Sequence, residues 1–244
     1  MKSGQTRTCE PEMFSDVAEI FANERNALHY DTRDVFFLIG DNDWNDCNSP
    51  SQAFSYWMNN FGNGKKTNGL NTGPNPYGFG TMSDPNIEVD YDFQGNQQSS
   101  QIYPSSASNL AFFYEGVLFV GLNQVGGSSV GDESERVANN FNWVRTNMAK
   151  YKSQGMRTLI VFAHADMGSA RYEYFGRPFQ ELLRSQYPDM LVVYMYVILC
   201  FSVSNFVFIS FVSFIMMRNS TPYLTLTNAH PKKRDLSLKA WRWA

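Results

Sequence analysis

The spacing of apolar residues predicts four helices along the chain. They are expected over residues 12–26, 49–61, 132–154 and 179–185. The clearest amphipathic stripe belongs to 132–154, where apolar residues alternate by four and three positions as they do along one face of a helix. The face expected to be buried in the first helix consists of Phe14, Val17, Ile20 and Phe21.

Short continuous apolar runs bounded by polar or glycine-containing turns predict buried strands. The predicted strands are residues 35–39, 86–93, 110–114, 117–122, 158–162 and 190–194, and all of them except 86–93, which is only strand-like, are apolar runs of this kind. The dipeptide Glu115-Gly116 predicts a hairpin turn between the third and fourth run. Alternation of such strands with amphipathic helices is typical of an α/β fold built on a mixed sheet.

One apolar run is much longer than a buried strand. Met190 to Met217 contains 28 residues without a charge, and an uncharged run longer than about 18 residues is a candidate membrane span. We therefore expect residues 195–217 to form a single transmembrane helix in contact with lipid. The alternative is that the run packs as strands, because 16 of the 28 residues are Val, Ile, Phe or Tyr.

Charge changes along the chain. The net charge is −3, with 20 Lys and Arg against 23 Asp and Glu, so a nucleic-acid partner is not expected. Residues 218–244 form a basic tail of net charge +5, whereas residues 1–217 are acidic. The tail favours the cytoplasmic side of a membrane, but no cleavable signal peptide precedes the acidic part, so the orientation stays open. If the apolar run is not native to the protein, a soluble domain remains.

These patterns divide the chain into four parts. Residues 1–14 are polar and are expected to be a disordered or truncated start, and residues 15–194 to form the α/β domain. The membrane segment at 195–217 and the tail at 218–244 follow. The three cysteines give no disulfide framework or metal-ligand spacing, and a pair between Cys9 and Cys47 is left undecided.

Two polar loops that each follow a predicted strand contain the candidate chemistry. The first holds Asp41, Asn42 and Asp43, and the second holds His164 and Asp166. Carboxylate, amide and imidazole groups at strand ends can bind a divalent metal ion for hydrolysis. The alternatives are an Asx-rich turn that caps the next helix in the first loop, and a hydrogen-bonded core histidine in the second.

Four strings along the chain resemble one enzyme family. FFLIGDNDWNDC, VLFVGLNQVGGSS, ERVANNFNWV and LIVFAHADM are similar to calcineurin-like metallophosphoesterases, in particular to the branch with a Gly-Asp-Asn-Glu/Asp-Trp block followed by Asp-Cys. The resemblance spans roughly Phe36 to Leu191. It implies a sandwich of mixed sheets with metal ions at strand ends and a metal-activated water that cleaves a small phosphate ester.

The resemblance also implies roles for the loop residues. Asp41 takes the position of the family's metal-binding Asn, and Asn42 that of the His that acts on the leaving group. A shift of one residue makes Asn42 itself the metal ligand, and both alignments stay open. Asp43 completes the block, His164 takes the position of a metal-binding His, and Asp166 lies two residues beyond it.

Three family blocks are missing from this chain. No Asp-x-His strand or Gly-Asp-x-x-Asp block precedes Phe36, and residues 195–198 replace the final Gly-His-x-His block. The three histidines of the chain, His29, His164 and His230, are too few for a complete two-metal site. We expect a phosphoesterase-like domain of impaired activity with one Mn, Fe or Zn ion rather than two. The alternatives are a non-catalytic, membrane-anchored relic of the fold that acts as a binding or structural module, and an unrelated anchored domain.

Overall fold

The computed structural model has a mixed α/β fold with a mixed sheet, as the sequence predicts. The structure describes residues 8–40, 43–62, 75–91, 109–124, 133–168, 171–203, 206–217, 224–227 and 239–240. The chain divides into two compact units. Unit 1 comprises residues 1–112 and 125–133, and unit 2 comprises residues 113–124 and 134–244.

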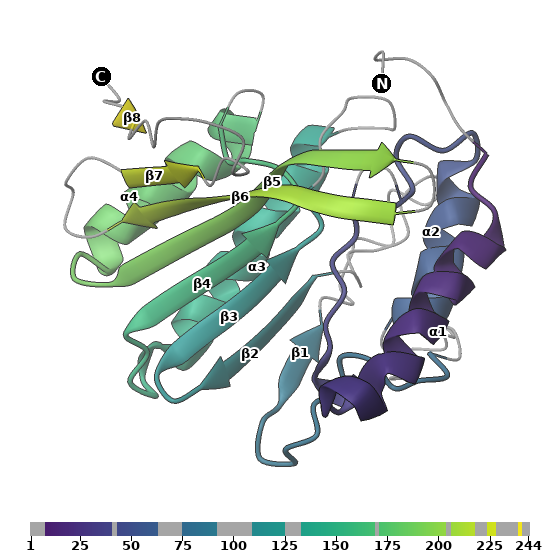
Figure 1. Ribbon diagram of the computed structural model, residues 1–244. Helices are drawn as coiled ribbons and strands as arrows, with labels where there is room; N and C mark the ends of the chain where they lie inside the picture. The colour runs from purple at the N-terminus through teal and green to yellow at the C-terminus, as the bar shows by residue number, and fades with distance from the viewer. Residues whose placement is uncertain are drawn as a thin grey trace. The chain divides into compact units, whose positions relative to one another are not determined.

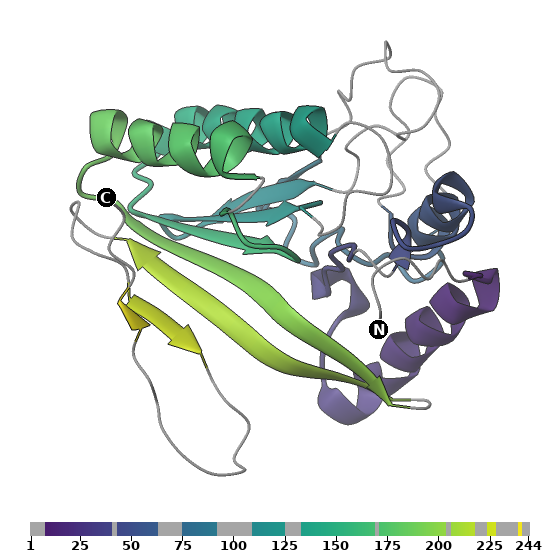
Figure 2. The ribbon, with the colours of Figure 1, turned by 90° about the horizontal axis from the view of Figure 1, so that it is seen from above.

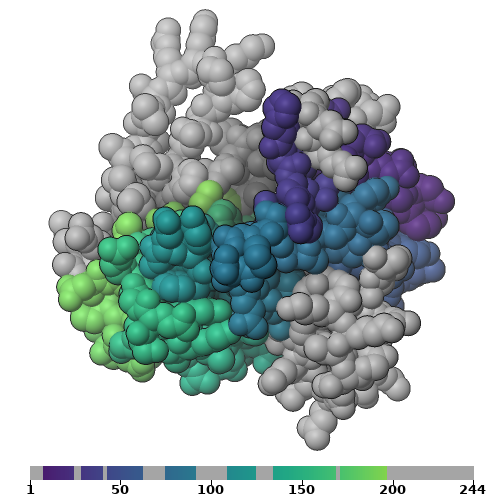
Figure 3. Space-filling view, turned by 90° about the horizontal axis from the view of Figure 1, so that it is seen from below, coloured from purple at the N-terminus to yellow at the C-terminus, as the bar shows by residue number. Residues whose placement is uncertain are grey.

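Unit 1 is built on two helices and a short strand pair. Helix α1 spans Pro11–Leu28, the 3-10 helix η1 spans Thr32–Asp34, and α2 spans Pro50–Phe61. Strand β1, Val89–Tyr91, pairs antiparallel with the first part of β2, Leu110–Tyr114. Helix α1 begins at Pro11, inside the stretch 1–14 that the sequence predicts to be disordered or truncated. Residues 75–91 of this unit, blue in Figure 3, form part of its surface.

The predicted face of α1 is wrong in part. Phe14 is buried, but Val17, Ile20 and Phe21 are between 39% and 59% exposed. The residues that join Phe14 in the core are Ala18 and Ala22. Small side chains allow α1 to approach its neighbours closely, so the buried stripe is displaced around the helix from the larger apolar residues.

The strand predicted over residues 35–39 is not a strand. Val35 has an extended backbone, yet this segment joins no ladder with another described residue. Aromatic packing holds it instead, since the ring of Phe37 lies 4.3 Å from that of Phe61 and 5.0 Å from that of Phe79. The segment therefore occupies the core through its side chains, without the backbone pairing that a strand requires.

Unit 2 contains three parallel strands covered by helices. After the last residues of β2, the turn at Glu115 and Gly116 leads into β3, Val117–Leu122. Strand β4, Thr158–Ala163, pairs parallel with β3 and with β5, Leu191–Val203. Helices α3, Glu133–Lys152, and α4, Arg177–Gln186, lie on one face of these strands (Figures 1 and 2), and a π-helix, η4, Tyr172–Gly176, leads into α4.

The helix predicted over residues 195–217 is not supported. The described part of this stretch continues β5 and then forms β6, Phe206–Met217, which pairs antiparallel with β5. Strands β7, Leu224–Thr227, and β8, Lys239–Ala240, follow in antiparallel order. Among the residues that the structure describes, no helix is long and apolar enough to span a bilayer. The many β-branched and aromatic residues of the run favour the extended backbone, and its contact with lipid stays a prediction.

Candidate functional site

The loop after β4 contains His164 and Asp166 and lies against the end of β3. Because β3 and β4 are parallel, with Leu122 beside Ala163, their carboxyl ends meet at one edge of the sheet. The backbone N–H of Ala165 donates a hydrogen bond of 2.7 Å to the carbonyl oxygen of Gln124, the second residue after β3. His164 is half-buried in this loop. The prediction that the loop with His164 and Asp166 directly follows a buried strand is confirmed.

A buried polar network fixes the position of this loop. The side chains of Gln124 and Tyr194 are both fully buried. The amide nitrogen Nε2 of Gln124 donates to the hydroxyl of Tyr194 at 2.8 Å and to the carbonyl oxygen of Asp166 at 3.0 Å. The Tyr194 hydroxyl in turn donates to the carbonyl oxygen of Ala165 at 2.8 Å. Burial, assisted by the negative charge of Asp166, raises the pKa of Tyr194 well above its usual value, so the phenol stays neutral.

The carboxylate of Asp166 is already engaged by groups of the protein. Its Oδ1 accepts a hydrogen bond of 2.9 Å from the N–H of Gly168 and lies 3.5 Å from a terminal nitrogen of Arg171. Nε of Arg171 donates to the carbonyl oxygen of Asp166 at 2.9 Å. The Arg171 side chain is only 13% exposed, against 40% for Asp166. A cation that binds this carboxylate must therefore compete with a well-anchored guanidinium.

Sequence reasoning missed Gln124, Tyr194 and Arg171 as parts of this edge. Gln124 lies just after the strongest predicted strand. This position could have marked it as a candidate, because the residues just after parallel strands lie together at one edge of the sheet. Tyr194 lies within a predicted strand, and only the pairing of Val161 with Tyr194 shows that it faces the end of β4. Arg171 lies beyond the loop, and no spacing rule points to it.

The other candidate loop belongs to unit 1. Asp41 and Asn42 lie outside the described residues. Oδ2 of Asp43 accepts a hydrogen bond of 2.8 Å from the N–H of Gly40, so this carboxylate closes its own turn. The N-cap of α2 is Ser49 and has no side-chain capping bond, so the capping role considered for the acidic loop does not belong to Asp43.

The end of this loop is fixed firmly. Trp44 and Asn45 are almost completely buried, and the ring of Trp44 packs edge-on against Phe54 of α2 at 5.6 Å. Cys47 forms a disulfide with Cys9, which resolves the pairing that the sequence leaves undecided.

The residues that the structure describes supply only part of a metal centre. Asp43 belongs to unit 1 and His164 and Asp166 to unit 2, so their mutual distance stays a prediction. Within the described part of the chain, no group of three or more His, Cys, Asp or Glu side chains is placed to hold an ion. The described loop after β4 offers one imidazole, of His164, and one carboxylate, of Asp166, which is paired with Arg171. A two-metal site needs more ligands than this.

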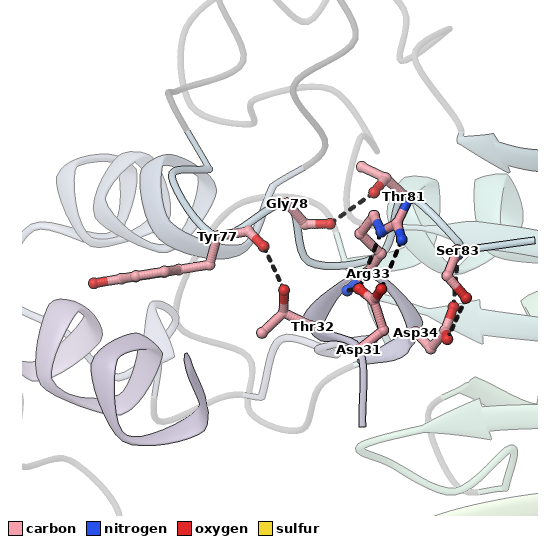
Figure 4. Close-up of polar contacts among 8 residues, drawn as sticks. All are labelled: Asp31, Thr32, Arg33, Asp34, Tyr77, Gly78, Thr81 and Ser83. Atoms are coloured by element: carbon pink, nitrogen blue, oxygen red, sulfur yellow. Dashed lines mark hydrogen bonds and ion pairs between the residues drawn. The ribbon is translucent and has the colours of Figure 1, made fainter. Parts of the chain in front are cut away.

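A second polar cluster lies in unit 1 and was not predicted. Figure 4 shows η1 joined to the segment 77–83: the hydroxyl of Thr32 donates to the carbonyl oxygen of Tyr77 at 2.8 Å, and Asp34 accepts two hydrogen bonds from Ser83. Asp31 accepts from the backbone and side chain of Arg33 (Figure 4). These bonds hold the segment in place without bringing ligating groups together.

Beside this cluster, residues 80–91 surround a hollow of about 250 Å³. Met82, Asp84 and Glu88 contribute to its lining together with Tyr91. The Tyr91 hydroxyl donates to the carbonyl oxygen of Gly80 at 2.6 Å, and burial raises the pKa of this tyrosine. The hollow is small and open, and its polar groups serve the local fold.

Comparisons of the chain with protein-family models, with curated proteins and with solved structures give no match.

Proposed function

We propose that this chain is a calcineurin-like metallophosphoesterase domain with an incomplete metal centre, which acts as a binding or structural module with little or no hydrolytic activity. The motif strings between Phe36 and Leu191 support the family, and the finer sandwich architecture of that family is part of the proposal. The observation that favours the loss of activity is the engagement of Asp166 by Arg171 and Gly168. A carboxylate held by a guanidinium is a poor ligand for a further cation, because the two positive charges repel each other.

A second candidate function is hydrolysis of a small phosphate ester with a single Mn, Fe or Zn ion. The position of His164 favours it, because His164 directly follows β4 at the carboxyl edge of a parallel pair, where α/β proteins bind their ligands. In this version His164 is a ligand and Asp41, Asn42 and Asp43 complete the site, with Asn42 either a further ligand or the group beside the leaving group. Within the described residues, fewer metal ligands are brought together than a metal-dependent hydrolase needs.

Metal content and turnover, measured on the same samples of the full chain, separate the two functions. The protein is loaded with Mn²⁺, Zn²⁺ or Fe²⁺, dialysed, analysed for bound metal, and assayed with a phosphomonoester and a phosphodiester. We expect metal well below one ion per chain and no turnover above buffer. Retention of one ion and metal-dependent turnover would establish the second candidate instead.

Two variants assign the result to the site. In the second candidate His164→Ala loses both metal and turnover, while the control His29→Asn, at an exposed residue with a positive φ that Asn tolerates, changes neither. In the first candidate Arg171→Ala releases Asp166 and raises metal retention. If Arg171→Ala leaves the metal content unchanged, the argument from the engaged carboxylate fails.

A further inference from the structure

Two contacts tie the chain just before α1 to the end of the acidic loop. The Cys9–Cys47 disulfide joins Cα atoms 5.7 Å apart and 38 positions apart in the sequence. Next to it, Nδ2 of Asn48 donates a hydrogen bond of 3.3 Å to the hydroxyl of Thr8. The disulfide and this hydrogen bond therefore couple the segment just before α1, which starts at Pro11, to the end of the acidic loop.

The two cysteines differ in their surroundings. Cys47 is 2% exposed and belongs to the aromatic core of unit 1 with Trp44 and Phe54. Cys9 is only half-buried and packs against the outside of this core. Exchange with an external thiol depends on access to a sulfur, so the Cys9 side of the bond is the side that a reductant can attack.

We propose that the Cys9–Cys47 disulfide is a redox clamp on residues 43–48, the described end of the acidic loop. A dithiol attacks the sulfur of Cys9 and Cys47 leaves as a thiolate. The second thiol of the reductant then displaces Cys9, so that the reductant becomes a disulfide and both cysteines end as thiols carrying its two protons. The inference rests on the proposed function in one respect, that the clamped loop is part of the ligand site.

Release of the clamp is expected to be local. The start of the loop keeps the Asp43–Gly40 hydrogen bond, and Trp44 keeps its place in the core. The part that depends on the disulfide is the last part of the loop, from Asn45 to Asn48, together with residues 8–10. The loss of a covalent closure across 38 positions gives these segments more open states.

Amide hydrogen exchange of the full chain, before and after treatment with dithiothreitol, tests the clamp. We expect exchange to increase roughly tenfold or more in peptides covering 8–14 and 43–49, and to stay unchanged in α2 and β4. The variant Cys47→Ser should give the reduced pattern without dithiothreitol, while Cys200→Ser, which removes the third cysteine, should give the oxidised pattern. Unchanged exchange in residues 43–49 would overturn the proposal. Increased exchange throughout both units would also overturn it, because the disulfide would then stabilise the whole fold rather than this loop.

A binding measurement keeps this inference apart from the proposed function. The same samples are titrated with a phosphodiester and with Mn²⁺. If exchange in the loop responds to dithiothreitol but neither probe binds in either state, the clamp stands, while a ligand-binding role and the second candidate function both fail. If a probe binds equally in both states and exchange does not respond, the clamp fails while a ligand-binding role stands.

Discussion

The hydroxyl of Tyr194, on the third parallel strand, donates a hydrogen bond of 2.8 Å to the carbonyl oxygen of Ala165, in the loop after the second. The same hydroxyl accepts from Gln124, which follows the first strand. One buried phenol thus links the backbone of the His164 loop to groups from all three strands. Together with the direct bonds from Gln124, this hydroxyl holds the loop in position, although the phenol itself has no charge and no candidate role in chemistry.

Replacement of Tyr194 by Phe tests this link. The change removes the hydroxyl and keeps the ring, so the Ala165 carbonyl loses a donor and Gln124 loses an acceptor in a fully buried place. We expect Tyr194→Phe to lower the free energy of unfolding by about 1–3 kcal/mol, measured by denaturant titration. The control Tyr174→Phe, at a side chain that is 47% exposed, should change it by less than about 0.5 kcal/mol. Equal effects would show that the hydroxyl does not hold the loop.

High pH should weaken the fold through its buried tyrosines. The pKa values of Tyr91 and Tyr194 are raised from the usual value of 10.0, first by burial and, for Tyr194, also by the charge of Asp166. Above about pH 10 the unfolded chain loses these protons while the folded chain keeps them, so the unfolded state binds fewer protons and stability falls as pH rises. Below this pH the stabilisation is fully present.

Above pH 10, each of these two tyrosines should lower the free energy of unfolding by up to about 1.4 kcal/mol per pH unit. Denaturant titrations between neutral pH and pH 11 measure the slope, and Tyr91→Phe and Tyr194→Phe should each remove their own share. A slope that survives in both variants would assign the alkaline weakening to other groups.

The strands that the sequence predicts best are those with strong local signals. Residues 110–114 and 117–122 are continuous apolar runs separated by Glu115-Gly116, and both ends of each strand agree with the structure. Glu115 and Gly116 both have positive φ, as a tight hairpin requires. Here composition and turn chemistry act over a few residues, so no distant contact is needed to define the element.

The predictions that fail concern segments whose structure depends on contacts with residues far away in the sequence. Residues 35–39 have the composition of a strand but contact Phe61 and Phe79 through side chains rather than pairing through the backbone. The face of α1 is decided by close approach at Ala18, which a search for large apolar residues overlooks. For the candidate site, the position after a strand predicts His164 and Asp166, whereas Arg171, which pairs with the carboxylate of Asp166, has no sequence signal.

Gly176, the last residue of the π-helix η4, packs closely against the chain that follows the His164 loop. A Cβ at residue 176 would lie 2.4 Å from the carbonyl oxygen of Met167 and 2.8 Å from the ring of Tyr172. Helix propensity alone favours Ala over Gly by about 1 kcal/mol, but a backbone oxygen at this distance must shift.

We therefore expect Gly176→Ala to destabilise the protein by about 1–3 kcal/mol, measured by thermal or denaturant unfolding. Ser185→Ala, at an exposed residue of the adjoining α4, serves as the control and should change stability by less than about 0.5 kcal/mol. A neutral or stabilising Gly176→Ala would mean that Met167 and the loop before it can move away without cost.

Two physical arguments lead to different secondary structures for residues 195–217. Its length and lack of charge favour a lipid-embedded helix, whereas its β-branched and aromatic residues favour the strands β5 and β6 that the structure contains. We expect removal of residues 195–244 to reduce the strand signal in circular dichroism and to leave the helix signal unchanged. A loss of helix signal on truncation would instead support the predicted transmembrane helix.

Partitioning between detergent and aqueous phases tests contact with lipid separately from secondary structure. An uncharged run of this size, if it were left in water, would expose more apolar surface than the few hundred Å² that a soluble monomer tolerates, so we expect the full chain to enter the detergent phase and the chain ending at 194 the aqueous phase. A chain ending at 217 is the matched control, because it loses only the basic tail and should partition like the full chain. If the full chain is monomeric in the aqueous phase without detergent, the membrane prediction is wrong and the run is buried within the protein itself.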